Sequence, residues 1–187
     1  MRRFFGILVI VISLFFSKKI SAQTYVKINL AGLPIGMING GAEAKIAKHF
    51  TLQPEFFISP WESFFGNKLQ IYNFNLEGRY YFKESFEHFY LGTNLGIAFF
   101  DLQKWNYLNT NSYQRGYSIL MGVTFGYQYQ LKERLNLDLY IGGANSQGFY
   151  HGYNMVNGER YEEKSPWNRS GEMIPYKIGV MLSYKLK

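Results

Sequence analysis

Apolar and polar residues alternate with a period of two over long stretches of the chain. Between Tyr72 and Lys83, for example, Phe74 and Phe82 belong to an apolar series that is interleaved with polar residues such as Asn73. Successive side chains of a strand point to opposite faces, so this period predicts strands with two unlike faces. The same pattern returns in 89–99, 117–130 and 176–187.

Weaker alternation completes an all-β pattern of eight predicted strands. Their ranges are 24–31, 39–47, 51–58, 69–83, 87–101, 114–131, 135–145 and 174–186. No stretch of useful length has the 3.6-residue period of an amphipathic helix. The sequence therefore favours a single β domain.

The predicted connections alternate between two kinds. Tight turns surround His49, Ser85 and Glu133, whereas the other four connections are longer. The long ones are 32–38, 59–68, 102–113 and 146–173. Short turns at one end and long loops at the other are typical of outer-membrane barrels. We therefore predict an eight-stranded antiparallel up-and-down transmembrane β-barrel with short periplasmic turns and long surface loops.

The composition of the two strand faces indicates which one meets lipid. One face is almost purely apolar and aromatic, and the other carries Asn, Gln, Thr, Tyr and Gly with few charges. A face in contact with water would carry many more Lys and Glu residues. We therefore expect the apolar face to point outward into lipid. The alternative is a soluble lipocalin-like ligand-binding barrel, in which the same alternation is turned inside out.

Charged residues on the predicted inner face balance each other. The lumen ion-pair candidates are Glu43, Lys45, Glu55, Glu77, Arg79, Asp138 and Lys177. Eight strands enclose an interior that side chains just fill, and an unpaired buried charge is costly, so these residues are expected to pair across the lumen. Inward glycines would make room for Tyr81, Tyr90 and Tyr140. The sequence thus predicts a plugged lumen without an open pore.

The first residues have the features of an export signal. Arg2 and Arg3 precede a mostly apolar run, and the small residue Ala22 precedes the expected cleavage site. We predict a signal peptide over 1–22 and a mature domain over 23–187, exported through the periplasm to the outer membrane. Four of the 20 Lys and Arg residues lie in that signal, so 16 − 13 leaves a mature net charge of +3 instead of +7. No basic cluster suggests nucleic-acid binding.

Several short segments resemble known barrel proteins. They are Pro60-Trp61, Glu77-Gly78-Arg79-Tyr80-Tyr81-Phe82, Phe89-Tyr90-Leu91-Gly92, Gly126-Tyr127-Gln128-Tyr129-Gln130-Leu131, Arg134-Leu135-Asn136-Leu137-Asp138 and Ile141-Gly142. Over about 25–150 the chain resembles the small outer-membrane β-barrel proteins, and more narrowly an uncharacterised domain-of-unknown-function family with that fold. The resemblance implies a fold and a location but no activity.

The last predicted strand is similar to a barrel-assembly signal. Lys177, Gly179, Leu182 and Tyr184 occupy its polar, glycine, apolar and aromatic positions. The chain departs from the common pattern because it ends in Leu186-Lys187 instead of an aromatic residue. The expected partners are therefore outer-membrane lipid and, during biogenesis, the barrel-assembly machinery.

The sequence offers little catalytic chemistry. It has no cysteine, and His49, His88 and His151 are too scattered for a metal site, so neither a metal nor another cofactor is expected. A lipid-modifying hydrolase or acyltransferase is the alternative function. It would combine Ser146, His151 and one acid among Glu159, Glu162 and Glu163. No nucleophile motif surrounds Ser146, so we predict a protein that is not an enzyme.

Aromatic residues are concentrated in the predicted long loops. The partner-contact candidates are Trp61, Phe64, Phe65, Trp105, Tyr107, Phe149, Tyr150, Tyr153 and Trp167. Such side chains are favoured at binding surfaces. We expect a structural or surface-interaction role in which these loops contact a surface protein or a glycan. Packing of the loops against one another is an equally open interpretation.

Overall fold

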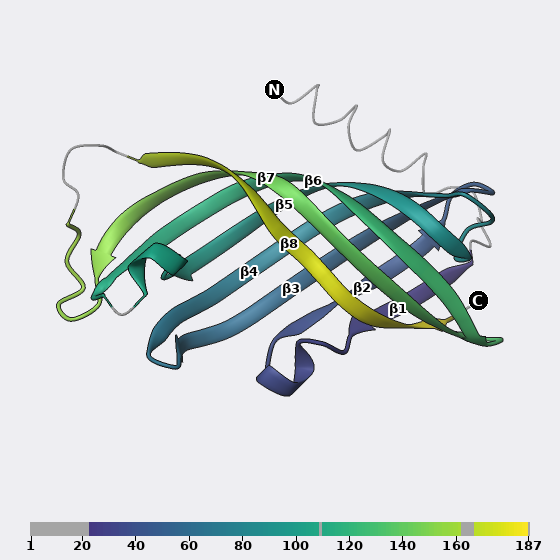
Figure 1. Ribbon diagram of the computed structural model, residues 1–187, viewed down its shortest axis with the longest axis horizontal. Coiled ribbons are helices and arrows are strands. Elements are labelled where there is room, and N and C mark those ends of the chain that lie inside the picture. The colour runs from purple at the N-terminus through teal and green to yellow at the C-terminus, as the bar shows by residue number, and fades with distance from the viewer. Residues whose placement is uncertain (1–22, 109, 162–166, 187) are drawn as a thin grey trace, which may run out of the picture.

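The computed structural model describes residues 23–108, 110–161 and 167–186, which form an antiparallel β-structure (Figure 1). The predicted signal peptide, 1–22, lies outside the described residues. The strands are β1 (Thr24–Asn29), β2 (Ile38–Lys45), β3 (Phe50–Phe64), β4 (Asn67–Tyr81), β5 (His88–Leu102), β6 (Ser112–Lys132), β7 (Leu135–Asn154) and β8 (Asn168–Lys185). The prediction of an all-β chain with eight antiparallel strands is confirmed.

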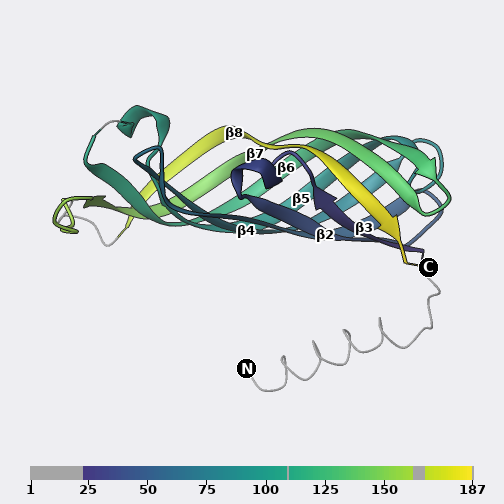
Figure 2. The same cartoon turned by 90° about the horizontal axis from the view of Figure 1, so that it is seen from below.

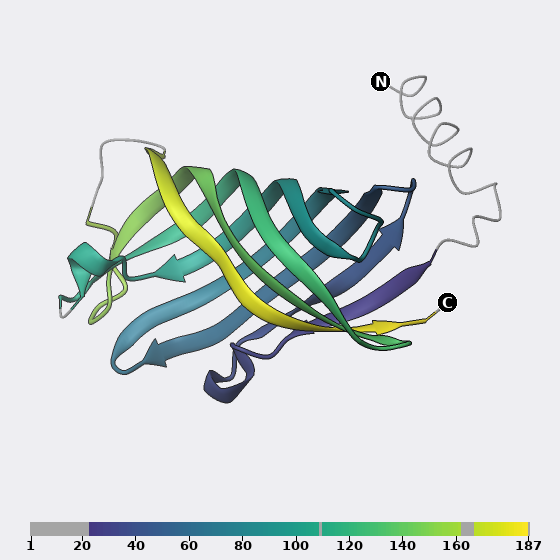
Figure 3. The same cartoon turned by 45° about the vertical axis from the view of Figure 1, so that its right-hand side comes forward.

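The sheet closes on itself. Each strand pairs with the next one in the chain, and β8 pairs with β1 to complete a closed barrel. β1 begins and β8 ends at one end of the barrel, beside the turns that join β2 to β3, β4 to β5 and β6 to β7 (Figure 3). We call this the turn end and the opposite end the loop end.

Several strands run further toward the loop end than predicted. The predicted loop 59–68 is a continuation of β3 and β4, which are joined by a two-residue turn at Phe65 and Gly66, both with positive φ (49° and 85°). Likewise, β7 extends to Asn154 and β8 begins at Asn168, which shortens the predicted loop 146–173. These extensions are rich in Ser, Gly, Asn and Gln, so their alternation is weak in the sequence. Two 3-10 helices, η1 (Leu33–Ile35) and η2 (Trp105–Tyr107), lie in the remaining loops.

The height of the barrel wall is uneven. β1 and β2 have only 6 and 8 residues, whereas β6 and β7 have 21 and 20. β8 therefore runs well past the end of β1, and η1 projects from the low side of the wall (Figures 1 and 2). The low side consists of β1, η1 and β2.

The side chains are distributed in the reverse of a water-soluble domain. Among the described residues, 23 polar or charged side chains are buried against 10 hydrophobic ones. Large apolar side chains instead cover the outside, with Phe74, Leu95 and Val123 each more than half exposed. The two faces thus have the polarity predicted from the sequence.

One residue departs from the predicted alternation. The register between β7 and β8 shifts between Gly142 and Gly143, which pair with Lys177 and Pro175. Tyr176 is the extra residue of this β-bulge and packs inside with Ile174, although the sequence pattern had placed it on the outer face. The bulge turns both Tyr176 and Lys177 toward the lumen.

Glycines make room for the large side chains of the lumen. A Cβ added to Gly126 would overlap the ring of Tyr90, and one added to Gly179 would lie 2.5 Å from the hydroxyl oxygen of Tyr140. These two tyrosines therefore require glycine on the neighbouring strand. No helix in the described part of the chain is long and apolar enough to cross a membrane.

Candidate functional site

A layer of ion pairs crosses the lumen. Its members come from six strands and are Lys27, Glu43, Glu55, Glu77, Arg79, Asp138 and Lys177, all buried. We call these seven residues the ion-pair layer. Lys45, the remaining predicted candidate, lies half-buried at the end of β2 and has none of the ion pairs found between described residues.

Arg79 is the centre of this layer. Its Nε lies 2.6 Å from Glu77 Oε1, and its Nη1 lies 2.7 Å from Asp138 Oδ2 and 3.3 Å from Glu43 Oε2. The guanidinium also lies over the ring of Tyr90, with 4.3 Å between Cζ and the ring centroid. One side chain on β4 thereby connects acids on β2 and β7 with an acid on its own strand.

The two lysines extend the layer to its edges. Lys27 Nζ pairs with Glu43 and lies 2.7 Å from Asp138 Oδ2. On the other side, Lys177 Nζ lies 2.6 Å from Glu77 Oε2 and 2.8 Å from Glu55 Oε2. Every charged group of the layer therefore has an opposite charge at contact distance.

Hydroxyl groups compensate for the excess of one carboxylate over the three cations. Tyr81 donates to Glu43 over 2.7 Å, and Tyr90 donates to Asp138 over 2.9 Å. Thr124 donates to Glu77 over 3.0 Å. Hydrogen bonds to ionised carboxylates are stronger than neutral ones, so these donors help to hold the charges in the lumen.

The lumen is tightly packed on the turn side of the ion-pair layer. Tyr81, Tyr90 and Met181 belong to a buried cluster there, which Tyr140 completes from the cavity side, and Phe86 covers it with its ring 6.2 Å from that of Tyr81. Side chains therefore fill this half of the lumen. Because Phe86 belongs to the β4–β5 turn, the turn end itself is partly closed by a side chain.

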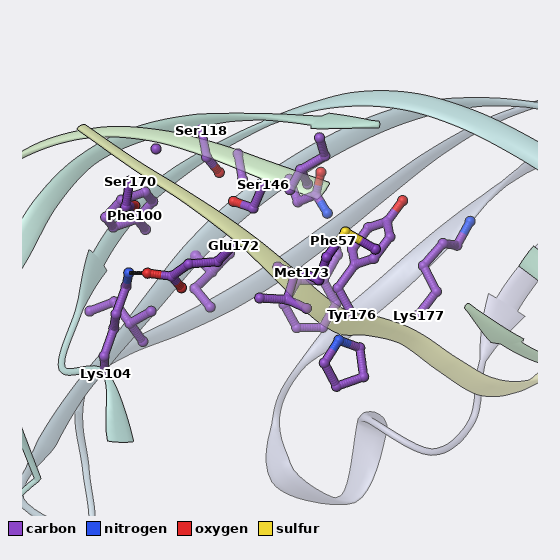
Figure 4. Close-up of a pocket in the computed structure, with 18 of the residues that line it drawn as sticks. Phe57, Phe100, Lys104, Ser118, Ser146, Ser170, Glu172, Met173, Tyr176 and Lys177 are labelled. Carbon is purple, nitrogen blue, oxygen red and sulfur yellow. Dashed lines mark hydrogen bonds and ion pairs between the residues drawn. The ribbon is translucent and has the colours of Figure 1, made fainter. Parts of the chain in front are cut away.

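The other half of the lumen contains a cavity of about 1110 Å³, which the prediction of a filled barrel had not anticipated. Its floor is polar and includes Asn29, Asn39, Tyr140 and Lys177. Its wall is largely apolar, with contributions from Phe57, Ile71, Phe100, Leu120 and Ile174. Figure 4 shows part of this lining, including Phe57, Tyr176 and Lys177. We call it the loop-end cavity.

The mouth of the loop-end cavity lies under η2. Lys104, directly before η2, forms an ion pair of 2.6 Å with Glu172 on β8 (Figure 4). Trp105 and Tyr107 of η2 also line the cavity. The loop between β5 and β6 therefore covers part of the mouth and is tied to β8.

Sequence reasoning missed this cavity, although the inward positions of β4 contain a signal. From the turn end to the loop end they change from Arg79 and Glu77 through Asn75 and Asn73 to Ile71. An inward face that becomes apolar toward one end indicates that charged packing stops partway along the lumen. A prediction that treats all inward positions alike therefore misses the cavity.

The predicted catalytic residues are not brought together. Ser146 lines the loop-end cavity, whereas His151, five positions along β7, is on the outer face and stacks on Trp167 with ring centroids 4.2 Å apart. Five residues of strand span about 16 Å. Glu159 lies in the β7–β8 loop, where its carboxylate accepts a hydrogen bond from the side-chain amide of Asn157. Glu162 and Glu163 lie outside the described residues.

The partner-contact candidates separate into two groups. Trp61, Phe64, Phe149, Tyr150 and Tyr153 lie within strands, and several candidates pack on neighbours, as Phe149 does on Tyr117 and Trp61 does on Phe64. Trp61 also donates from Nε1 to the carbonyl of Ile35, the last residue of η1, over 2.9 Å. By contrast, Phe65 and Trp105 are 91% and 86% exposed. These two are the most accessible aromatic side chains at the loop end.

Comparison with known families places the chain in an uncharacterised group. Residues 6–186 match the family described as "Protein of unknown function (DUF3575)", and the chain belongs to this family. The match extends past the resemblance seen in the sequence, since it includes the last strands. No curated protein matches the chain.

Proposed function

We propose that this protein is an integral β-barrel of a bacterial outer membrane with a structural or surface-interaction role and no catalytic activity. One observation carries the proposal: the closed sheet buries charged and amide side chains and exposes apolar ones. Exposed apolar area of this extent is unfavourable in water and favourable in hydrocarbon. A soluble ligand-binding barrel would show the opposite distribution.

The strand lengths support the same placement. A strand tilted by about 45° needs about 9–11 residues to cross the hydrocarbon core. β3 to β8 have 15 to 21 residues, so they are long enough to cross and to continue beyond the bilayer. Closure of the sheet also gives most backbone N–H and C=O groups a hydrogen-bond partner on a neighbouring strand. Such pairing is required in hydrocarbon, because no water is present to bond these groups.

The loop end is the side that we assign to the cell surface. It carries η2, the β7–β8 loop and the exposed rings of Phe65 and Trp105. In this proposal the predicted signal peptide directs export, and the barrel-assembly machinery inserts the mature chain. The exposed aromatic side chains then provide contacts for a surface protein or a glycan.

A charge on the outer face tests membrane insertion. Leu95 is 58% exposed near the middle of β5, so Leu95→Lys would place an ammonium in hydrocarbon. The expected cost is about 2–4 kcal/mol near the bilayer midplane. We expect less folded protein in phospholipid vesicles, measured as the fraction of the band that shifts on boiling before electrophoresis.

Asn106→Lys in η2 is the matched control, because it adds the same charge at the loop end. It should fold as the wild type does. Two results would contradict the proposal: equal folding of both variants in vesicles, or a wild-type chain that is a folded monomer in buffer without lipid or detergent.

A further inference from the structure

The loop-end cavity has the size of a ligand site. Pockets for small molecules commonly have volumes of about 300–1,000 Å³, with mostly apolar walls and a few polar groups. The cavity of about 1110 Å³ lies just above this range and combines an apolar wall with an amide-rich floor. An elongated molecule with an apolar chain fits this lining better than a compact polar one.

The charges around the cavity are already neutralised. Four charged side chains line it, and they form two pairs: Lys177 with Glu55, and Lys104 with Glu172. A ligand with a net charge would therefore find no free counter-charge, and its burial would be costly. The head group of the ligand is therefore expected to be neutral.

Two amide side chains in the lining have hydrogen-bonding capacity that the fold does not use. Asn73 and Gln114 are 7% and 3% exposed, and both line the cavity. Asn73 Oδ1 and Gln114 Oε1 are buried and have no hydrogen-bond partner. Buried polar atoms without partners are rare in folded proteins, and hydroxyl or amide donors of a ligand would satisfy such groups.

The cavity also reaches the outside of the barrel at the low side of the wall. β1 pairs only with residues 181–185 of β8, so β8 from Asn168 to Lys177 has β7 as its neighbour on one side and no described strand on the other. Pro175 removes one backbone donor from this edge. The lining includes Met173 and Ile178, each 76% exposed on the outer face of β8.

In a membrane this opening would face hydrocarbon. β1 and β2, with 6 and 8 residues, are shorter than the about 9–11 residues needed to cross, so the low side of the wall ends within the bilayer. This step rests on the proposed membrane location. An acyl chain lying across the opening would contact the apolar wall inside and the lipid outside.

From these observations we propose that the loop-end cavity binds one neutral single-chain amphiphile, an acyl chain with a hydroxyl-bearing head. The chain lies along the wall formed by Phe57, Phe100 and Ile174. The hydroxyl groups meet the amides of Asn73 and Gln114. The ion-pair layer closes the site toward the turn end.

Photo-crosslinking in an amphipol tests this site directly. The probe is monopalmitoylglycerol with a diazirine near the end of its acyl chain, and labelled residues are mapped by mass spectrometry. We expect labels on inward residues, Phe57 and Ile174 among them. Unlabelled monopalmitoylglycerol should compete about tenfold better than palmitate, because the carboxylate carries a charge.

A pair of neighbouring substitutions supplies the control. Ser146→Trp would fill part of the cavity, whereas Gln147→Trp puts the same ring on the outer face of β7. Inward labelling should fall about tenfold in the first variant and stay within about twofold of wild type in the second. Both variants are scored only after they show the boiling-dependent band shift of the folded barrel.

Three results would overturn the proposal. They are labels confined to outward residues such as Leu95, equal labelling of the two tryptophan variants, and equal competition by palmitate. Each is separable from a failure of the membrane proposal, because the band shift and the vesicle experiment with Leu95→Lys report insertion whether or not the cavity is occupied.

Discussion

At the scale of single residues, the charged side chains of the lumen are the least replaceable part of the protein. Arg79 is 1% exposed and is the only residue of the ion-pair layer that contacts three acids. Removing one partner of a buried ion pair leaves an uncompensated charge and commonly costs about 3–5 kcal/mol. An exposed ion pair is worth about 0–1 kcal/mol.

Arg79→Met is therefore expected to lower the free energy of unfolding by about 3–5 kcal/mol, because Glu43, Glu77 and Asp138 keep only two lysines between them. Urea unfolding in phospholipid vesicles measures the change. Lys48→Met is the control, since Lys48 pairs with Glu84 on the surface of the turn end and both side chains are more than half exposed. A loss below about 1 kcal/mol for Arg79→Met would show that the layer does not need this cation.

At the scale of elements, the turn between β3 and β4 combines an unfavourable backbone with an exposed side chain. Phe65 has a φ of 49°, which favours Gly or Asn, and its ring is 91% exposed. The following Gly66 also has a positive φ, so the turn resembles the two-residue hairpin turns that prefer Asn-Gly. Phenylalanine thus contributes little burial at this position, and its ring contacts only Phe64 among the aromatic pairs of the described chain.

Phe65→Asn should stabilise the barrel by about 0.5–1 kcal/mol, because asparagine tolerates the left-handed backbone better. The change would appear as a higher midpoint of urea unfolding in vesicles. Phe64→Asn serves as the comparison, since Phe64 is a strand residue that packs on Trp61 and should lose stability when it is replaced. If Phe65→Asn is destabilising instead, the ring supports the fold and is not reserved for contacts outside the chain.

The elements could be predicted where both faces of a strand have a clear character. β4, β5 and β6 alternate apolar and polar residues over most of their length, and their predicted ranges differ from the structure by only a few residues. The loop-end parts of β7 and β8 lack apolar residues at regular spacing, so the sequence does not predict that these strands continue. The bulge at Tyr176 also left no trace in the sequence, because tyrosine occurs on both faces of these strands, inward at Tyr140 and outward at Tyr184.

At the scale of the whole molecule, the sequence predicts short first and second strands, 24–31 and 39–47, but not how far β8 continues past them toward the loop end. The seven members of the ion-pair layer occupy inward positions, and six of them, all except Lys27, are among the predicted candidates. The loop-end cavity depends instead on how far β8 runs beyond β1. That difference in length is set by register around the closed sheet, which no single strand encodes.

The orientation of the whole barrel can be measured with single cysteines, because the natural chain has none. Asn106→Cys marks the loop end, Glu133→Cys the β6–β7 turn and Leu95→Cys the outer face of β5. With a membrane-impermeant maleimide on intact cells, we expect labelling of the loop-end cysteine only. After the outer membrane is made permeable, the turn cysteine should react as well, while the cysteine on β5 stays protected because thiolates do not form in hydrocarbon. Labelling of the turn before the loop end would reverse the orientation proposed here, and rapid labelling of the β5 cysteine in intact cells would place that face in water.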